Sequence, residues 1–202
     1  MSDLEGALGF SLHTGWAAAV VVIRDGAKIE AIFRRRLELL PAETAIPRFV
    51  YHSAAELSLE EAAGLVESAR AAVRNMARQA IQETLNSVKL KIRAAGIPGG
   101  STPVPSDLSK ILGSHALIHA AEGYLFQQAV LDGCRSCGIS GVSLRTREVW
   151  PKAAALCGMD EKRLRSTVDS IGKTIGPPWT ADQKIATASG LIALLESTKT
   201  RE

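Results

Sequence analysis

The sequence contains few cysteines and few aromatic residues, and it has no long apolar run. Three cysteines among 202 residues exclude the disulfide framework of a small secreted fold. The longest apolar run, from Trp16 to Ile23, has the length of a buried strand and is far too short to cross a bilayer. With 46% hydrophobic residues, the composition is that of an ordinary globular protein with a sizeable core.

The chain also lacks a basic and apolar leader at its start. Its first residues, Met-Ser-Asp-Leu-Glu, are acidic and do not form the charged and apolar regions of a signal peptide. We therefore expect a cytoplasmic protein that does not associate with a membrane. The length predicts a single domain over residues 1–202, with a helical excursion near residues 150–175.

No strong excess of charge is present, because 24 basic residues oppose 21 acidic ones for a net charge of +3. This balance is weak support for a nucleic-acid partner. The dense basic run is Arg34-Arg35-Arg36, in which Arg34 and Arg36 would share one face of a strand. They would either protect a solvated edge strand or contact phosphates. Lys184 is a third candidate for phosphate contact, and its alternatives are pairing with a carboxylate or plain solvent exposure.

Two of the cysteines form the motif Cys134-x-x-Cys137, followed by Gly138. A zinc site of this type needs a second pair of ligands, and Cys157 stands alone. A thioredoxin-like site needs the pair at the start of a helix, whereas this pair lies where a helix is predicted to end. We therefore interpret the cysteines as buried or incidental thiols.

Hydrophobic periodicity and turn signals predict the element order β-β-β-α-β-α-β-α. The turns at Thr14-Gly15 and Asp25-Gly26 separate the first three strands, which would form an antiparallel meander. The predicted strands are 6–13, 16–23, 28–39, 88–97 and 139–148, and the predicted helices are 58–87, 107–134, 151–158, 160–170 and one that begins at Thr180.

The predicted helix at 58–87 opens with a capping box, in which the Ser58 hydroxyl accepts from an early amide and Glu61 reaches back. Its apolar residues recur at helical spacing and form one stripe. Such a helix spans roughly 40 Å at 1.5 Å per residue, more than one face of a sheet needs. The excess predicts either a homodimer through this helix or packing on another element of the chain.

Two segments at opposite ends of the chain carry a resemblance to a known family. The first is residues 9–16, GFSLHTGW, and the second is residues 176–186, GPPWTADQKIA. Together with the element order, they resemble the ribonuclease H-like superfamily, most of all its Holliday-junction resolvase (RuvC-type) branch. The resemblance implies an α/β fold with a five-stranded mixed sheet and helices on both faces.

In that superfamily, acids on the first strand, near the end of the fourth strand and on the last helix bind two divalent metals. In this chain, Ser11 and His13 stand on the first strand, no acid ends the fourth strand, and the last helix keeps Asp182. One carboxylate cannot hold the usual pair of Mg²⁺ or Mn²⁺ ions, which need several oxygen ligands. The resemblance therefore implies a divergent member that lacks most of the catalytic carboxylates.

The histidines offer other ligands. His115 and His119 lie four residues apart on a predicted helix, with Glu122 three residues further on, so the three share one face. Two imidazoles at this spacing can converge on one ion. Their alternative role is to line a helix–sheet interface through hydrogen bonds to the backbone. The candidate metal ligands are His115, His119, Glu122 and Asp182.

The resemblance also supplies a candidate catalytic site, which combines His13, His119, Glu122 and Asp182. Histidine ligands would favour Mn²⁺ or Zn²⁺ over Mg²⁺, and one histidine could instead serve as a general base without any cofactor. Asp182 has an alternative explanation, because the helix dipole stabilises a carboxylate in a first turn whatever the function.

These residues support two main interpretations of function. The first is a divergent, metal-dependent nuclease or phosphodiesterase with histidines in place of the lost carboxylates. The second is a non-catalytic module that binds nucleic acid or another protein on a degenerate nuclease scaffold, which the missing acids favour. Nucleotide binding, as in the actin-like relatives of the fold, ranks last because His13-Thr14-Gly15 is a poor phosphate hairpin.

Overall fold

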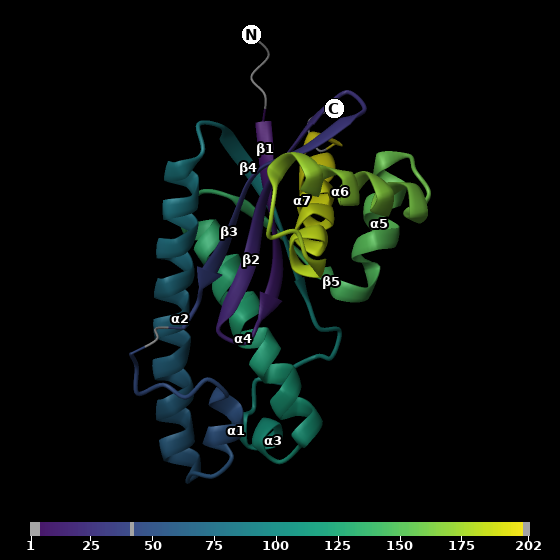
Figure 1. Cartoon of the computed structure of the whole chain (residues 1–202). Coiled ribbons are helices and arrows are strands. Elements are labelled where there is room, and N and C mark those ends of the chain that lie inside the picture. The colour runs from purple at the N-terminus through teal and green to yellow at the C-terminus, as the bar shows by residue number, and fades with distance from the viewer. Residues whose placement is uncertain (1–4, 41–42, 200–202) are drawn as a thin grey trace.

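The computed structural model describes residues 5–40 and 43–199, which form a five-stranded sheet covered by helices on both faces (Figure 1). Met1 to Leu4, on which most of the expectation of a leaderless start rests, lie outside these described residues. Within the described ranges, no helix is both long enough and apolar enough to span a bilayer.

The sheet is mixed and has the strand order β3-β2-β1-β4-β5. Its strands are β1 (Glu5–His13), β2 (Trp16–Asp25), β3 (Lys28–Glu38), β4 (Lys91–Gly99) and β5 (Ser140–Arg145). β1, β2 and β3 form an antiparallel meander, whereas β4 and β5 run parallel to β1. The predicted α/β fold with a five-stranded mixed sheet is confirmed.

Tight turns hold the meander in register. His13 and Trp16 face each other as the last residue pair of β1 and β2. Gly15 and Gly26, in the two turns, have positive φ values of 86° and 56°, which glycine adopts without steric cost. β2 is covered on both faces, and this explains why Ala17 to Ile23 is continuously apolar rather than alternating.

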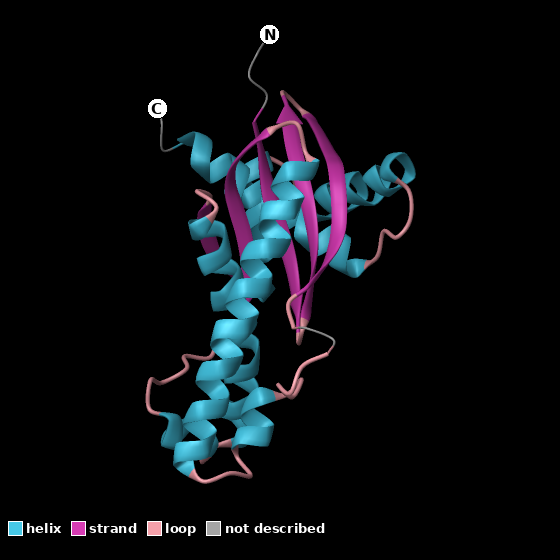
Figure 2. Ribbon diagram, turned by 90° about the vertical axis from the view of Figure 1, so that its left-hand side faces the viewer, coloured by secondary structure: helices cyan, strands magenta, loops and turns pink. Residues whose placement is uncertain are grey.

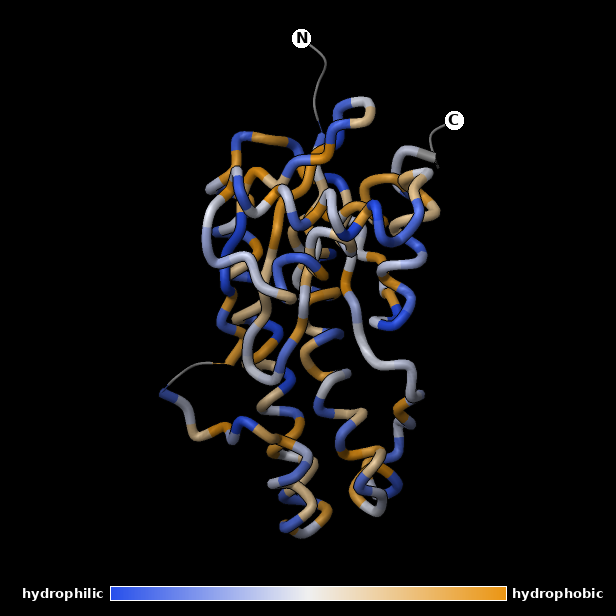
Figure 3. The backbone as a smooth tube through the Cα atoms, turned by 45° about the vertical axis from the view of Figure 1, so that its right-hand side comes forward, coloured by the Kyte–Doolittle hydropathy of each residue, from blue (hydrophilic) through white to orange (hydrophobic). Residues whose placement is uncertain are grey.

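Helices cover the two faces of the sheet as separate layers, which Figure 2 shows from the side. They are α1 (Val50–Ala54), α2 (Leu59–Ser87), α3 (Leu108–Leu112), α4 (His115–Ser136), α5 (Val149–Cys157), α6 (Glu161–Ile175) and α7 (Ala181–Lys199), with a 3₁₀ turn at Thr146–Glu148. α2 and α4 share one apolar core with Leu8 and Phe10 of β1. On the opposite face α7 packs on β1, β2 and β4, α6 packs on β3, and α5 packs on α7. Both hydrophilic and hydrophobic stretches occur along the backbone of the helices (Figure 3). The single domain over 1–202, with an excursion at 150–175, stays a prediction.

α2 and α4 run past the end of the sheet and, with α1 and α3, form what we call the helical projection (Figures 1 and 2). The capping box of α2 is confirmed, since Ser58 Oγ accepts from the Glu61 amide and Glu61 Oε2 accepts from the Ser58 amide. The apolar stripe of α2, which includes Val66 and Val73, is buried in the chain's own core. The excess length therefore packs within the chain, and a homodimer through residues 58–87 stays a prediction.

The predicted single helix at 107–134 is wrong, because the chain forms two helices there. Asp107 caps α3 by accepting from the amides of the second and third residues after it. The backbone is then extended at Ser114, with φ −139° and ψ 114°, before α4 begins. The break places His115 in the first turn of a new helix rather than in the middle of a long one.

Two later boundaries also differ from the prediction. The strand expected at 139–148 ends at Arg145, where the chain enters the 3₁₀ turn. The helix expected at 160–170 continues to Ile175 as α6, and Gly172 within it leaves room for the ring of Trp179. The added residues pack into the core on the face of the sheet that carries α7.

Glycines bring α7 unusually close to the sheet. A Cβ added at Gly9 of β1 would overlap the carbonyl oxygen of Ala186, and one at Gly96 of β4 would overlap that of Ser189. Gly190 of α7 in turn faces the backbone of Gly9. The close contact brings the first turn of α7 to the end of β1, where the candidate site lies.

Candidate functional site

The end of β1 and the first turn of α7 meet in a small polar group. Asp182 Oδ1 accepts from the hydroxyl of Ser11 at 3.1 Å and lies 2.6 Å from His13 Nε2. An ionised carboxylate only accepts, so a neutral His13 paired with it would carry its proton on Nε2 and keep Nδ1 as an acceptor. The order differs from a nucleophilic triad, because Ser11 contacts the carboxylate and not the imidazole.

The His13 ring is held in place by stacking. It lies flat on Trp16, with 4.1 Å between ring centroids and 5° between the planes. Arg36 covers the opposite side of Trp16, with its Cζ 3.9 Å from the ring centroid. These residues lie close together on one sheet face, and the cation–π contact adds to the stacking. His13 is therefore oriented by Asp182 at one edge and by Trp16 across its plane.

The three basic residues proposed for nucleic-acid contact all have partners within the chain. Arg34 donates to the carbonyls of Pro177 and Pro178, which anchors the loop before α7 to β3. Arg36 Nε lies 2.5 Å from Glu38, and Lys184 Nζ lies 2.8 Å from an Asp169 carboxylate oxygen. Their role in nucleic-acid contact is untested and stays a prediction.

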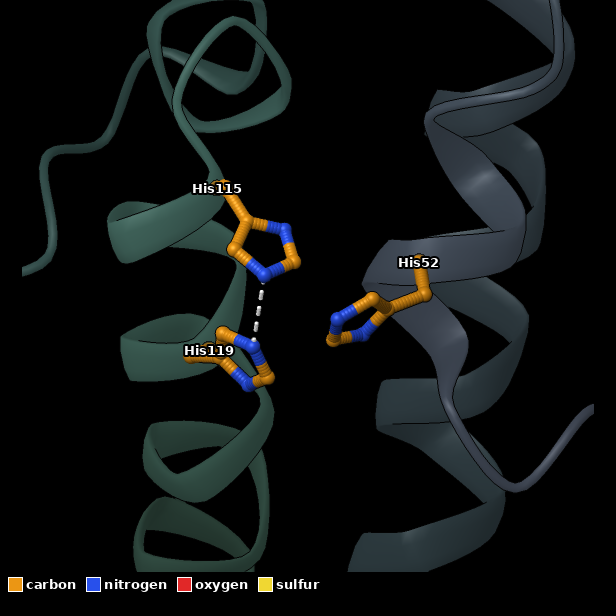
Figure 4. A group of neighbouring side chains, drawn as sticks. All are labelled: His52, His115 and His119. Carbon is orange, nitrogen blue, oxygen red and sulfur yellow. Dashed lines mark hydrogen bonds between the residues drawn. The ribbon is translucent and has the colours of Figure 1, made fainter.

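A second polar group lies in the helical projection, where three histidines face one another (Figure 4). His115 and His119 come from successive turns of α4, and His52 comes from α1. One ring nitrogen from each lies within 4.8 Å of the others. His115 Nε2 and His119 Nε2 are 3.0 Å apart, so one of them donates to the other. The spacing predicted from the sequence does bring these two imidazoles together.

Glu122 connects α4 to α1 behind this histidine group. Its carboxylate oxygen Oε1 accepts from the amides of Tyr51 and His52, at 2.8 and 3.1 Å, and lies 3.1 Å from His52 Nδ1. These amides belong to the second and third residues of α1. At the start of a helix such amides have no backbone acceptor, and a side-chain oxygen usually accepts from them instead. Glu122 is 4% exposed, and its Oε2 has no partner among the described residues.

A pocket of about 330 Å³ joins the two groups. His13 lines it from the sheet side, and His119 and Glu122 line it from α4. The structure thus brings these three predicted residues to one cavity. Asp182 does not line the cavity itself but contacts His13, which does. The predicted metal ligands, however, divide between the groups, because Asp182 lies with His13 whereas His115 and His119 lie with His52.

His52 is not among the candidate site residues that the sequence predicts. It follows β3 in a stretch with no motif of its own, and no spacing rule relates it to His115 or His119. Only the packing of α1 on α4, through Glu122, reveals the contact.

Comparison with known proteins identifies the scaffold. No family model matches the sequence, and no curated protein sequence matches it either. Two structures of Thermus thermophilus RuvC are similar, one alone and one in complex with a Holliday junction substrate. Their identities are 12% and 13% and their TM-scores 0.53 and 0.52, and each match covers 96% of both chains. The chain has the ribonuclease H-like fold of RuvC. At this identity the likeness shows the fold alone, and the chemistry must be argued from the site.

The metal pair implied by the family resemblance does not fit the residues of this RuvC-like scaffold. At the corresponding places, β1 offers Ser11 and His13, the end of β4 offers Pro98 and Gly99, and α7 offers Asp182. Asp182 is the one carboxylate among these described positions. Two hard cations held by oxygen ligands would therefore lack most of their coordination shell.

The Cys134-x-x-Cys137 motif takes no part in this site. Cys134 is buried on α4, and Cys137 caps the end of that helix. Burial raises the pKa of the Cys134 thiol to about 12 and also raises the pKa of Cys137. The thiolate that redox chemistry requires is thus disfavoured, in agreement with the structural interpretation.

Thiol labelling tests this assignment. We expect Cys134 to resist alkylation at neutral pH in the native protein and to react fully in denaturant, because burial both hides the sulfur and raises its pKa. Mass spectrometry of the labelled peptides measures the extent. Rapid native labelling of Cys134, at a rate near that of the denatured chain, would contradict a buried structural thiol.

Proposed function

We propose that the protein is a hydrolase of phosphodiester bonds in nucleic acid, with His13 as its general base. The observation that carries the proposal is the 2.6 Å contact between Asp182 Oδ1 and Nε2 of His13, a residue that lines the shared pocket. The RuvC-like scaffold supports the proposal, because the family resemblance implies a catalytic site at this end of the sheet.

The chemistry follows from the orientation of the imidazole. With Nε2–H held by Asp182, His13 Nδ1 is available to take a proton from a water molecule that attacks phosphorus. Asp182 then stabilises the imidazolium that forms, and stacking on Trp16 limits rotation of the ring. The imidazolium can return the proton to the leaving oxygen, which completes hydrolysis.

Basic residues beside the pocket support a phosphodiester substrate. A neighbouring pocket of about 340 Å³ is lined by Thr14, Arg36 and Arg48 among others, and by Glu38, with which Arg36 pairs. Thr14 also lines the pocket of His13, so the two hollows adjoin. Two guanidinium groups next to a histidine base are suited to a polyanionic strand, because guanidinium binds phosphate in a fixed geometry.

Cleavage of labelled branched DNA and of an RNA–DNA hybrid tests the proposal. We expect the wild-type chain to cleave at least one of them and Asp182→Asn to lower kcat about a hundredfold, the cost of a misplaced catalytic group, while KM holds. Asp169→Asn, which removes an exposed carboxylate paired with Lys184, is the matched control and should stay active. Equal loss in both variants would contradict the role of Asp182.

A second candidate function is nucleic-acid binding without cleavage. The single carboxylate at the family's catalytic positions favours it. Binding to branched DNA that weakens steeply with salt, with no cleavage under any metal condition, would establish this alternative and overturn the hydrolase.

A further inference from the structure

We infer that His52, His115 and His119 form a zinc site, with Glu122 as the residue that positions His52. Their three ring nitrogens already lie within 4.8 Å of one another. Three neutral imidazoles with an open fourth position are the ligand set that zinc takes at reactive sites. The site is separate from the carboxylate positions that the family resemblance singles out.

One of the nitrogen–nitrogen distances is already close to that between zinc ligands, whereas the His52 nitrogen, which lies within 4.8 Å of the other two, would have to move closer. Zn–N bonds of about 2.0–2.1 Å in a tetrahedron place two ligand nitrogens roughly 3.3 Å apart. His115 Nε2 and His119 Nε2 are 3.0 Å apart, so slight separation of the two rings would admit the ion between them. Both side chains are exposed and the His52 side chain is 32% exposed, which leaves the site open to solvent.

Glu122 gives an independent sign of a bound cation. It contacts Nδ1 of His52, whose ring points toward the other two histidines (Figure 4), so Nε2 is the nitrogen left to bind an ion. A carboxylate behind a ligand histidine is the usual outer shell of a protein metal site. The carboxylate is 4% exposed and one of its oxygens lacks a partner among the described residues, a costly arrangement that a nearby positive ion would offset.

The metal-stripped full chain should bind one equivalent of Zn²⁺ in a calorimetric titration. We expect each of His52→Ala, His115→Ala and His119→Ala to weaken binding at least 100-fold, and Glu122→Gln to weaken it roughly 10- to 100-fold. Co²⁺ in place of zinc should give the strong visible absorption of a tetrahedral ion, lost in the same variants. Circular dichroism verifies that each variant is folded.

Two further variants locate the ion. His13→Ala and Cys137→Ser should keep full zinc affinity, because neither residue belongs to the histidine group. The inference is overturned if the parent protein shows no saturable binding, if folded His115→Ala and His119→Ala bind as tightly as the parent, or if Cys137→Ser loses the ion.

The zinc site and the proposed hydrolase can fail separately. Stoichiometric zinc binding in a protein that cleaves no nucleic acid would keep the site and overturn the hydrolase. Cleavage that depends on His13, in a protein that binds no zinc, would do the reverse.

Discussion

Replacing Gly9 by valine is expected to lower the free energy of unfolding by at least about 3 kcal/mol and to leave a large fraction of the protein unfolded. The new side chain would overlap the backbone of α7 at Ala186, where no rotamer relieves the clash. α7 would have to move off β1, which opens the core on that face of the sheet. Denaturation in urea, followed by circular dichroism, measures the change.

Gly64 provides the matched control for this substitution. It is an exposed glycine within α2, and an added Cβ there meets nothing within 4 Å. Gly64→Ala should therefore stabilise the protein, by about 0.5–1 kcal/mol, since alanine is the better helix former. If Gly9→Val unfolds at the same urea concentration as the wild type, the close packing of α7 on β1 is incorrect.

His13→Gln is expected to lower the rate of hydrolysis by roughly 10²–10⁴-fold, the usual contribution of a general base. Glutamine retains a donor for Asp182 and fills similar space, but it cannot accept a proton from water. Binding of substrate should change little, because the pocket keeps its shape. Single-turnover cleavage of labelled DNA under saturating enzyme measures the chemical step directly.

Rescue by added imidazole separates a chemical role of His13 from a structural one. In His13→Gly, free imidazole should restore part of the rate, since the vacated space next to Asp182 and Trp16 suits the same ring. A variant that stays inactive at all imidazole concentrations, or a His13→Gln protein with wild-type rate, would contradict the general-base assignment.

Much of the fold can be predicted from the sequence because its signals are local. The turn glycines Gly15 and Gly26 and the apolar run of β2 define the meander, and the capping box at Ser58 marks the start of α2. The break at Ser114 does not follow from the sequence pattern, because helical periodicity continues across it. The boundary between two such helices depends on what each helix packs against.

The candidate site likewise has contacts that the sequence predicts and contacts that it does not. His115 and His119 share one helix face, so their meeting follows from spacing alone. The contact of His13 with Asp182 joins the two ends of the chain and was expected only through the family resemblance. His52 could not be predicted, because its position depends on a carboxylate from a helix far along the sequence.

The capping of α1 by Glu122 has a consequence for the order in which the molecule is assembled. A helix of five residues with no cap of its own is not stable alone, so α1 forms only once α4 supplies the carboxylate. His52 is therefore positioned beside the other two histidines in the native protein and not in the denatured chain. Zinc at this position would act on the folded population alone, and at a free concentration of 100 times its Kd it would favour that population by about 2.7 kcal/mol.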